Sequence, residues 1–290
     1  MSKKDSASEN KEVAVVAGGQ VAPAFMDNSL FGAGFEGMDS ESFAIPFIQI
    51  LQKMSPLVDP DDPKYIEGAK AGMLFNTVTQ KLYDGKSGVL IVPCYYKRSY
   101  IQWGGRESAE GGFKGEHAVE AINDMLADET KIKVVDGRMY VPNPDGTVNE
   151  KKNDYFADTR AHYVLVIDPD TGEYGRALIS LSSSQIKASK MLNTALQQKK
   201  IKDAAGNLRT PPTFANTVRL TTIGQSNDKG SWSGARFDLE GLVSDKEIFN
   251  EAVAFYKDIA AGAVNVDYNK QADAAHTEQA SSTPQDAEQF

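Results

Sequence analysis

The sequence predicts a mainly β (α+β) fold of about seven strands interrupted by two helices, with disordered ends. Three observations predict it. Runs rich in β-branched and aromatic residues recur through the middle of the chain, Gly, Pro and Asp mark turns between them, and both ends have a low-complexity polar composition. We therefore expect a disordered N-terminal arm at 1–42, a core at 43–266 and a disordered acidic tail at 267–290.

The first part of the core is predicted to hold strands followed by an acidic insertion. Residues 43–103 contain a dense apolar stretch and then two runs with the composition of strands. The block at about 104–160 opens with a glycine-rich loop and includes a short helical pattern at 118–127 and a hairpin turn at Asp136. Because this block is acidic and irregular, we expect an insertion carried on the sheet.

The second part of the core is predicted to alternate strands with helices. A serine run is expected to cap the first of these helices, and Ser244 with Glu247 is expected to form a capping box for the second. The predicted elements, in order, are a hairpin at 162–181, a helix at 182–202, strands at 211–224 and 231–243, and a helix at 244–262.

Charge is distributed unevenly along the chain, although the total is −9. Residues 70–106 hold six Lys and Arg residues against Asp84 alone, and residues 174–219 hold eight against Asp203 alone. Residues 107–173 hold fifteen acids against seven bases. The acidic total therefore hides two basic stretches, and this pattern is more informative than the net charge.

One basic stretch interleaves aromatic and cationic side chains, which is the combination that single-stranded nucleic acid needs. Bases stack on aromatic rings for about 1–3 kcal/mol each, and phosphates pair with cations. On a strand, Tyr96, Arg98 and Tyr100 share one face. Oligonucleotide-binding barrels present such a face, so we predict an oligonucleotide-binding-like β-barrel. The residues predicted to bind nucleic acid are Tyr95, Tyr96, Lys97, Arg98, Tyr100, Trp103, Arg106, Lys187, Lys190, Lys199, Lys200, Lys229 and Trp232. For each aromatic residue taken singly, packing in the core is the more common role.

Sequence motifs typical of catalytic sites are weak in this chain. Cys94 lies within an apolar strand, where a structural thiol is more common than a reactive one. The histidines are scattered, and the glycine-rich loop lacks phosphate-binding spacing. Asp145 and Glu150 only loosely resemble the acidic constellation of some nucleases. We therefore expect no enzyme activity, no catalytic residue, no metal site and no cofactor.

The last nine residues, STPQDAEQF, place two acids before a terminal aromatic residue. This tail resembles the C-terminal tips of bacterial and bacteriophage single-stranded DNA-binding proteins. Separately, the segments IPFIQILQKMSP, GMLFNTVT, IVPCYYKRSYIQW, ISLSSSQIKASK and NDKGSWSG are similar to a broadly distributed bacteriophage family that we associate with replication modules. The resemblance implies a phage protein that coats DNA intermediates and recruits replication or recombination proteins through Asp286, Glu288 and Phe290.

We therefore predict a sequence-tolerant single-stranded DNA-binding protein of phage replication, recombination or repair, with homo-oligomerisation left open. No apolar run approaches the roughly 18 residues that span a bilayer, so we expect no membrane partner. Cys94 is the single cysteine and the N-terminal residues lack the apolar region of a secretory signal, so we expect a cytoplasmic protein. Two alternatives remain: a virion or assembly protein whose aromatic residues bury a subunit interface, and a metal-dependent nuclease or recombination enzyme that uses the acids at 145–152.

Overall fold

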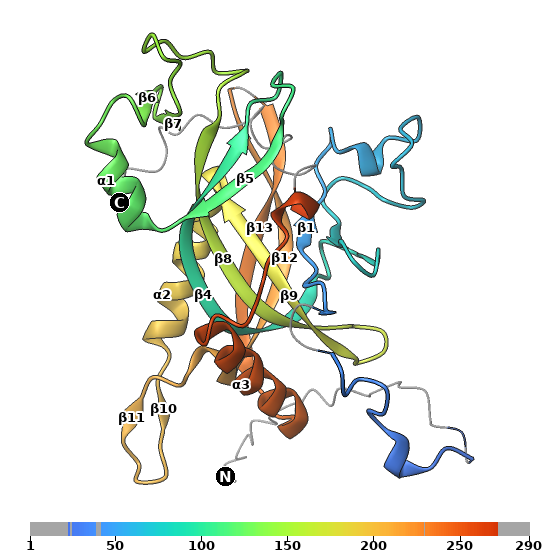
Figure 1. The fold of residues 1–290 in the computed structure, drawn as a ribbon. Helices are drawn as coiled ribbons and strands as arrows, with labels where there is room; N and C mark the ends of the chain where they lie inside the picture. Colours follow the sequence, from blue (N-terminus) through green and yellow to red (C-terminus); the bar gives the residue numbers. More distant parts are fainter. Residues whose placement is uncertain (1–22, 24, 39–41, 229, 272–290) are drawn as a thin grey trace, which may run out of the picture.

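An antiparallel sheet of eight strands dominates the protein and curls into an open half-barrel (Figure 1). The computed structural model describes residues 23, 25–38, 42–228 and 230–271. The sheet has the order β13-β12-β4-β8-β7-β6, and in addition β5 pairs with β4 and β9 pairs with β8. Its strands are β4 (Val89–Gly104), β5 (Gly112–His117), β6 (Lys133–Val135), β7 (Arg138–Tyr140), β8 (Tyr155–Ile167), β9 (Tyr174–Ser182), β12 (Asn216–Asn227) and β13 (Gly230–Leu242). The prediction of a mainly β fold is confirmed.

The two central strands, β4 and β8, pair along almost their whole length. Their register shifts between Pro93 and Tyr95, so Cys94 occupies a bulge. Proline has no backbone N–H to donate and is tolerated in sheets at bulges, and a bulge bends the strand that carries it. The bulge also inverts which residues of β4 face each side. Ile91 and Tyr96 therefore lie on one face of the sheet, whereas Cys94 and Trp103 lie on the other.

Three helices cover the sheet among the described residues. Helix α3 (Lys246–Ala260) places Phe255 in the aromatic core that also holds Trp103 and Tyr163. On the opposite face, α2 (Ile186–Gln198) contributes Leu192 and Leu196 to an aliphatic core. The short helix α1 (Val119–Leu126) covers Tyr100 and Phe156 at one end of that face. Between α1 and α2, which both lie on the left in Figure 1, a strip of the β4–β8 face carries polar side chains instead.

A small sheet of β1 (Ile48–Ile50), β2 (Leu74–Asn76) and β3 (Leu82–Tyr83) lies beside the open edges of the large sheet. Phe47 forms a parallel bridge with Leu178 of β9, and the Gln52 amide exchanges hydrogen bonds with the backbone of Ser233 on β13. The Gln185 side chain bonds the same edge, accepting from the Ala235 N–H. The Gln52 and Gln185 side chains thus bond backbone groups of the edge strand β13 that would otherwise be free to pair with another chain.

Three predictions about helix ends are wrong. The predicted helix at 182–202 begins at Ile186 without a side-chain cap, because the serines form a 3₁₀ turn and the Gln185 amide is used on β13. It ends at Gln198, and Ile201–Lys202 (β10) pairs with Leu208–Arg209 (β11) as a projecting hairpin. In α3 the cap is Asp245 rather than Ser244, since the Asp245 carboxylate accepts from the N–H groups of Glu247 and Ile248.

In the part of the chain that the structure describes, no helix has both the length and the apolar composition needed to cross a membrane.

Candidate nucleic-acid interface

The polar strip between α1 and α2 contains one face of the predicted aromatic and basic strand. The register of β4 and β8 sets Tyr96 opposite His162, Arg98 opposite Arg160, and Tyr100 opposite Asp158. Side chains of paired residues point to the same face of a sheet. The sequence alternation therefore places Tyr96, Arg98 and Tyr100 together, as predicted, and pairing adds three residues from β8.

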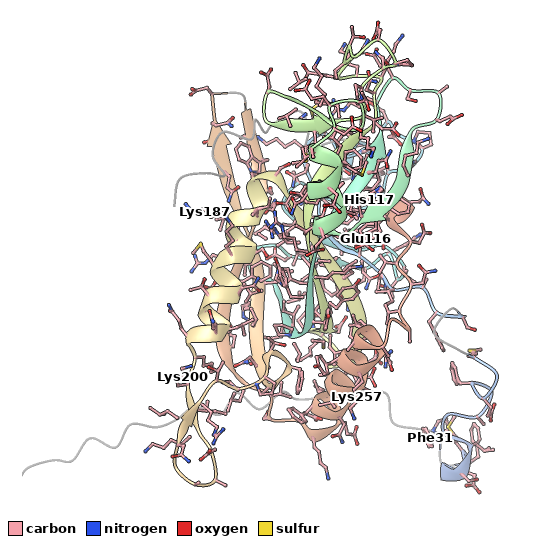
Figure 2. The ribbon with its side chains drawn as sticks, turned by 60° about the vertical axis from the view of Figure 1, so that its left-hand side comes forward. Phe31, Glu116, His117, Lys187, Lys200 and Lys257 are labelled. Atoms are coloured by element: carbon pink, nitrogen blue, oxygen red, sulfur yellow. The ribbon has the colours of Figure 1, made fainter. Side chains whose placement is uncertain are left out.

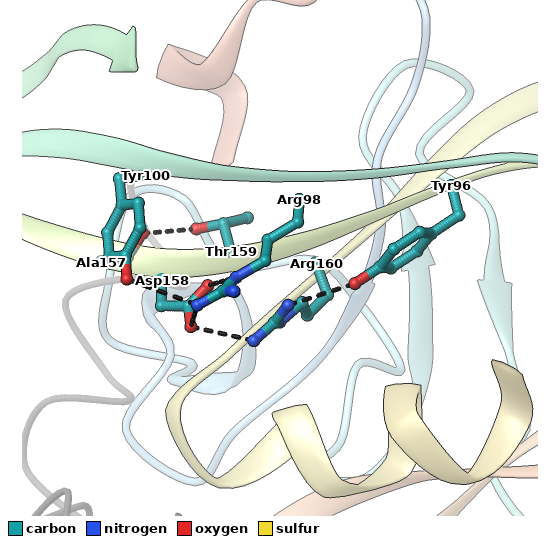
Figure 3. A network of polar contacts seen from close by, with 7 residues as sticks. All are labelled: Tyr96, Arg98, Tyr100, Ala157, Asp158, Thr159 and Arg160. Carbon is teal, nitrogen blue, oxygen red and sulfur yellow. Dashed lines mark hydrogen bonds and ion pairs between the residues drawn. The ribbon is translucent and has the colours of Figure 1, made fainter. Parts of the chain in front are cut away.

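A carboxylate shared by two guanidinium groups organises this strip (Figure 3). The Asp158 carboxylate accepts from Arg98 Nε at 3.1 Å, from Arg98 Nη2 at 2.9 Å and from Arg160 Nη2 at 2.9 Å. Arg160 Nη1 donates to the Tyr96 hydroxyl at 3.2 Å, and the Arg98 guanidinium lies 5.8 Å from the centre of the Tyr100 ring. The hydrogen bonds to Asp158 raise the pKa of Arg98. One acid balances two cations, which leaves one positive charge uncompensated.

Within the strip, the Arg160 side chain is buried and the Tyr96 side chain is exposed to solvent. Arg160 is 8% exposed, and its Nε has no hydrogen-bond partner among the described residues. Tyr96 is 37% exposed, and the Arg98 side chain is also partly open to solvent. A ring and a cation that are both accessible on one strand face are suited to stacking a base and pairing its phosphate.

The other predicted stacking rings serve the fold instead. Trp103 is 4% exposed and packs edge to face on Phe113, with ring centres 6.2 Å apart. Tyr100 is buried beneath α1, and Tyr95 is half-buried between Tyr163 and Tyr256. In this fold Trp103 and Tyr100 present no free face to a base, so their role is packing rather than stacking.

Some cations of the predicted site are likewise bonded within the protein, whereas others are exposed to solvent. Lys97 lies on the opposite face from Arg98 and pairs with Glu116 at 2.9 Å. Lys199 donates to the Gly241 carbonyl at 2.8 Å, which ties the end of α2 to β13, and burial lowers its pKa. Arg106 is exposed in the loop after β4. Lys97 and Lys199 are therefore engaged within the protein.

The remaining lysines form an exposed row along α2 and the β10–β11 hairpin (Figure 2). We call Lys187, Lys190, Lys200 and Lys202 the lysine row. Neither an ion pair nor a hydrogen bond joins the side chain of Lys187, Lys190 or Lys202 to another described residue, and the Lys200 ammonium donates to the Thr210 hydroxyl. Asp203 is the only acid between 174 and 219, and it pairs with Arg209 at 2.7 Å. A 13-residue helix is about 20 Å long, so the row extends over several nucleotides.

His162 connects the polar strip to α2. Its Nε2 lies 2.7 Å from the Ser189 hydroxyl, and its ring centre lies 5.1 Å from that of Tyr96. Burial, assisted by the charge of Arg160, lowers the pKa of His162 to about 4. The ring is therefore neutral at pH 7, and it holds α2 directly beside the exposed Tyr96.

The other predicted site residues lie apart from this surface or outside the described residues. Trp232, on the β12–β13 hairpin, is half-buried, and its indole N–H donates to Gln225 at 2.7 Å. Lys229, Asp286, Glu288 and Phe290 lie outside the described residues.

Sequence reasoning missed the β8 half of the strip, Asp158, Arg160 and His162. The predicted hairpin begins at 162, and the predicted insertion extends to about 160. β8 begins at Tyr155, so Asp158 and Arg160 belong to the sheet. The alternation of polar and apolar residues at 155–162 is the only signal that could have extended the strand.

The described residues provide no group of three His, Cys, Asp or Glu side chains able to hold a metal ion. Asp145 is a turn residue: its carboxylate accepts from the backbone N–H and the hydroxyl of Thr147, and these bonds lower its pKa. Burial raises the pKa of Cys94 to about 12, so its thiol stays protonated at neutral pH.

Comparison with known proteins defines the class to which this half-barrel belongs. It is a bacteriophage protein: a family model described as "Pam3 phage gp34-like protein" matches residues 16–265. The chain belongs to this family, and the phage origin predicted from the sequence is confirmed. No curated protein and no solved structure matches the chain.

Proposed function

We propose that this protein binds single-stranded DNA without strong sequence preference during phage replication or recombination. The observation that carries the proposal is the lysine row, which lies beside the exposed Tyr96 and Arg98 in a stretch of sequence, 174–219, whose one acid is Asp203. Cations and an accessible ring together suit a flexible strand, because phosphates are uniform and every base has a face that can stack.

The curled sheet supplies a rigid platform for such binding. Tyr96 and Arg98 lie on a central strand, and α2 is fixed to the same sheet by the His162–Ser189 contact. We propose that this platform acts as an oligonucleotide-binding-like barrel does, with the strand held against a strand face between less regular segments. In this arrangement Tyr96 stacks one base, and Arg98, Lys187, Lys190, Lys200 and Lys202 approach successive phosphates.

The test is binding of fluorescently labelled oligo-dT, measured by anisotropy at several salt concentrations. Neutralising five phosphates on a single strand predicts a slope of about −3.5 in log K against log[salt]. The double variant Lys187→Glu/Lys190→Glu should weaken binding at least tenfold and flatten this slope. Lys257→Glu, on α3 far from the row in Figure 2, is the matched control and should bind normally. Binding that is absent, or equal in both variants, would refute the proposal.

Under the same proposal, the C-terminal residues Asp286, Glu288 and Phe290 recruit a replication or recombination protein to the coated DNA. A ring and an α-carboxylate on one terminal residue suit a basic, apolar pocket on that partner. Removing residues 282–290 should abolish the partner contact while DNA binding persists.

A second candidate function, an assembly or virion protein, is favoured by one observation. Large apolar side chains near the N-terminus are exposed, including Phe25, Leu30 and Phe31. Exposed apolar groups of this size are typical of surfaces that bind another protein. A protein of this kind would sediment with phage particles and would not bind oligo-dT.

A further inference from the structure

The described N-terminal segment, residues 25–38, keeps its apolar side chains in solvent. Phe25, Leu30, Phe31 and Phe35 are all more than half exposed, and Phe31 is 61% exposed. The hydrogen bonds of this segment close local turns, such as Leu30 to Asp27 and Met38 to Phe35. Such a concentration of exposed rings is unusual on a monomer and indicates a surface that another molecule covers.

The same segment is acidic. Residues 12–52 contain five Asp and Glu residues and no Lys or Arg. Asp27 and Glu36 lie next to the exposed rings in the sequence, and their carboxylates accept hydrogen bonds from backbone N–H groups of the segment, those of Ser29 and Gly34. The segment therefore combines apolar anchors with uncompensated negative charge, and its binding surface is expected to be positive and partly apolar.

The lysine row is both positively charged and partly apolar. Two large apolar side chains are exposed within it, Met191 on α2 at 64% and Leu208 on β11 at 67%. Methionine adapts its shape to apolar partners, and lysine stems cover apolar surface while their charges stay in water. Phe31 and Phe35 are of a size to pack on Met191 and Leu208 while Asp27 and Glu36 face the lysines.

Within one molecule the two surfaces lie on opposite sides. Phe31 lies on the side of the molecule away from Lys187 and Lys200 in Figure 2, and Figure 1 places the N-terminal segment across the sheet from α2. A contact between them therefore joins different molecules. Such a contact is heterologous, because each copy offers the segment on one side and the row on the other.

We propose that the N-terminal segment of one copy docks on the lysine row of a second copy, so that the protein associates head to tail. The association rests on this complementarity alone. Its consequence for DNA rests on the proposed function: a strand that occupies the row displaces the segment, so free protein is associated and DNA-bound protein exchanges this contact for phosphates.

The experiment measures the sedimentation velocity of the full chain at low salt. Wild-type protein should form species larger than the monomer, which dissociate as salt rises because the contact is charged. Phe31→Ser/Phe35→Ser and Lys187→Glu/Lys190→Glu should each sediment as monomers, with at least tenfold weaker association. Lys257→Glu should associate as the wild type does. Circular dichroism checks that each variant is folded.

Mixing the two defective variants gives the decisive result. The phenylalanine variant retains an intact row and the lysine variant retains an intact segment, so their mixture should form a one-to-one dimer and nothing larger. No dimer in the mixture, or unchanged association in either variant alone, would overturn the proposal. If oligo-dT fails to bind while the dimer forms, the proposed function falls and head-to-tail association stands.

Discussion

Tyr96 and Trp103 lie on the same strand, yet their environments differ, because they point to opposite faces of the sheet and α3 covers the face of Trp103. Tyr96 is open to solvent and its hydroxyl accepts from Arg160, whereas Trp103 is enclosed in the aromatic core. The type of a side chain therefore does not show whether the residue can bind a ligand until its neighbours in the fold are known. Arg98 and Lys97 differ in the same way, because one faces the open strip and the other pairs with Glu116.

Substitution of these two rings should separate binding from stability. Tyr96→Ala should weaken oligo-dT binding by about 1–3 kcal/mol, the value of one stacked base, with little loss of stability. Tyr96→Phe keeps the ring and should retain most of the affinity. Trp103→Ala should instead lower the free energy of unfolding by about 3–5 kcal/mol, measured in urea. Equal effects of Tyr96→Ala and Tyr96→Phe on DNA would argue against stacking.

His162 predicts a dependence of stability on pH. Its pKa is about 4 in the folded protein, below the ordinary value near 6.5, so the unfolded chain binds the proton more readily. Stability contributed by the neutral ring is complete above about pH 6.5 and is lost as pH falls toward 4, by about 3 kcal/mol at most. His162→Gln, which can keep a hydrogen bond to Ser189, should show a flatter profile over pH 4–6.5 in urea unfolding. A profile identical to that of the wild type would contradict this assignment.

Helix α2 has a structural side and a solvent side. Leu192 and Leu196 fill the aliphatic core, while Gln185 and Lys199, just beyond its two ends, bond the backbone of β13. Its solvent side carries lysines and Met191. The helix therefore covers a sheet edge and presents a positive surface, and both roles follow from its position beside β13.

Because the Gln185 side chain bonds the backbone of the edge strand β13, its substitution is expected to destabilise that strand locally. Gln185→Ala leaves the buried Ala235 N–H without its acceptor, which costs about 1–3 kcal/mol. Hydrogen exchange at the Ala235 amide should accelerate more than exchange at amides in the β4–β8 ladder. Gln197→Ala, on the exposed side of the same helix, is the control and should leave exchange unchanged. Uniform acceleration across the sheet would indicate a global rather than an edge effect.

Across the whole molecule, charge is separated more sharply in space than the total of −9 suggests. The lysine row lies on one side, and the acidic, apolar N-terminal segment lies on the other. A molecule arranged in this way has complementary surfaces for its own copies as well as a surface for a polyanion. Both proposals use the row, so they predict competition between DNA and self-association.

Local signals in the sequence were sufficient for much of the fold. Strand composition predicted β4, β12 and β13, and the Asp136-Gly137 turn, with both residues at positive φ, predicted the β6–β7 hairpin. These features depend on neighbouring residues, so periodicity and turn chemistry detect them. Helix caps were less predictable, because Gln185 is engaged by a distant strand and Asp245 competes with the adjacent Ser244.

The mainly β class, the two basic stretches and the alternation that sets Tyr96 beside Arg98 can all be predicted from the amino-acid sequence. The folded structure was needed to show which aromatic residues are buried, which lysine side chains are unpaired, and that Asp158 and Arg160 complete the strip. Composition and alternation are properties of neighbouring residues, whereas burial and pairing depend on strand register and on helices that are distant in the sequence. A single bulge at Cys94 changes the face of every residue after it, and no local pattern reports its consequence.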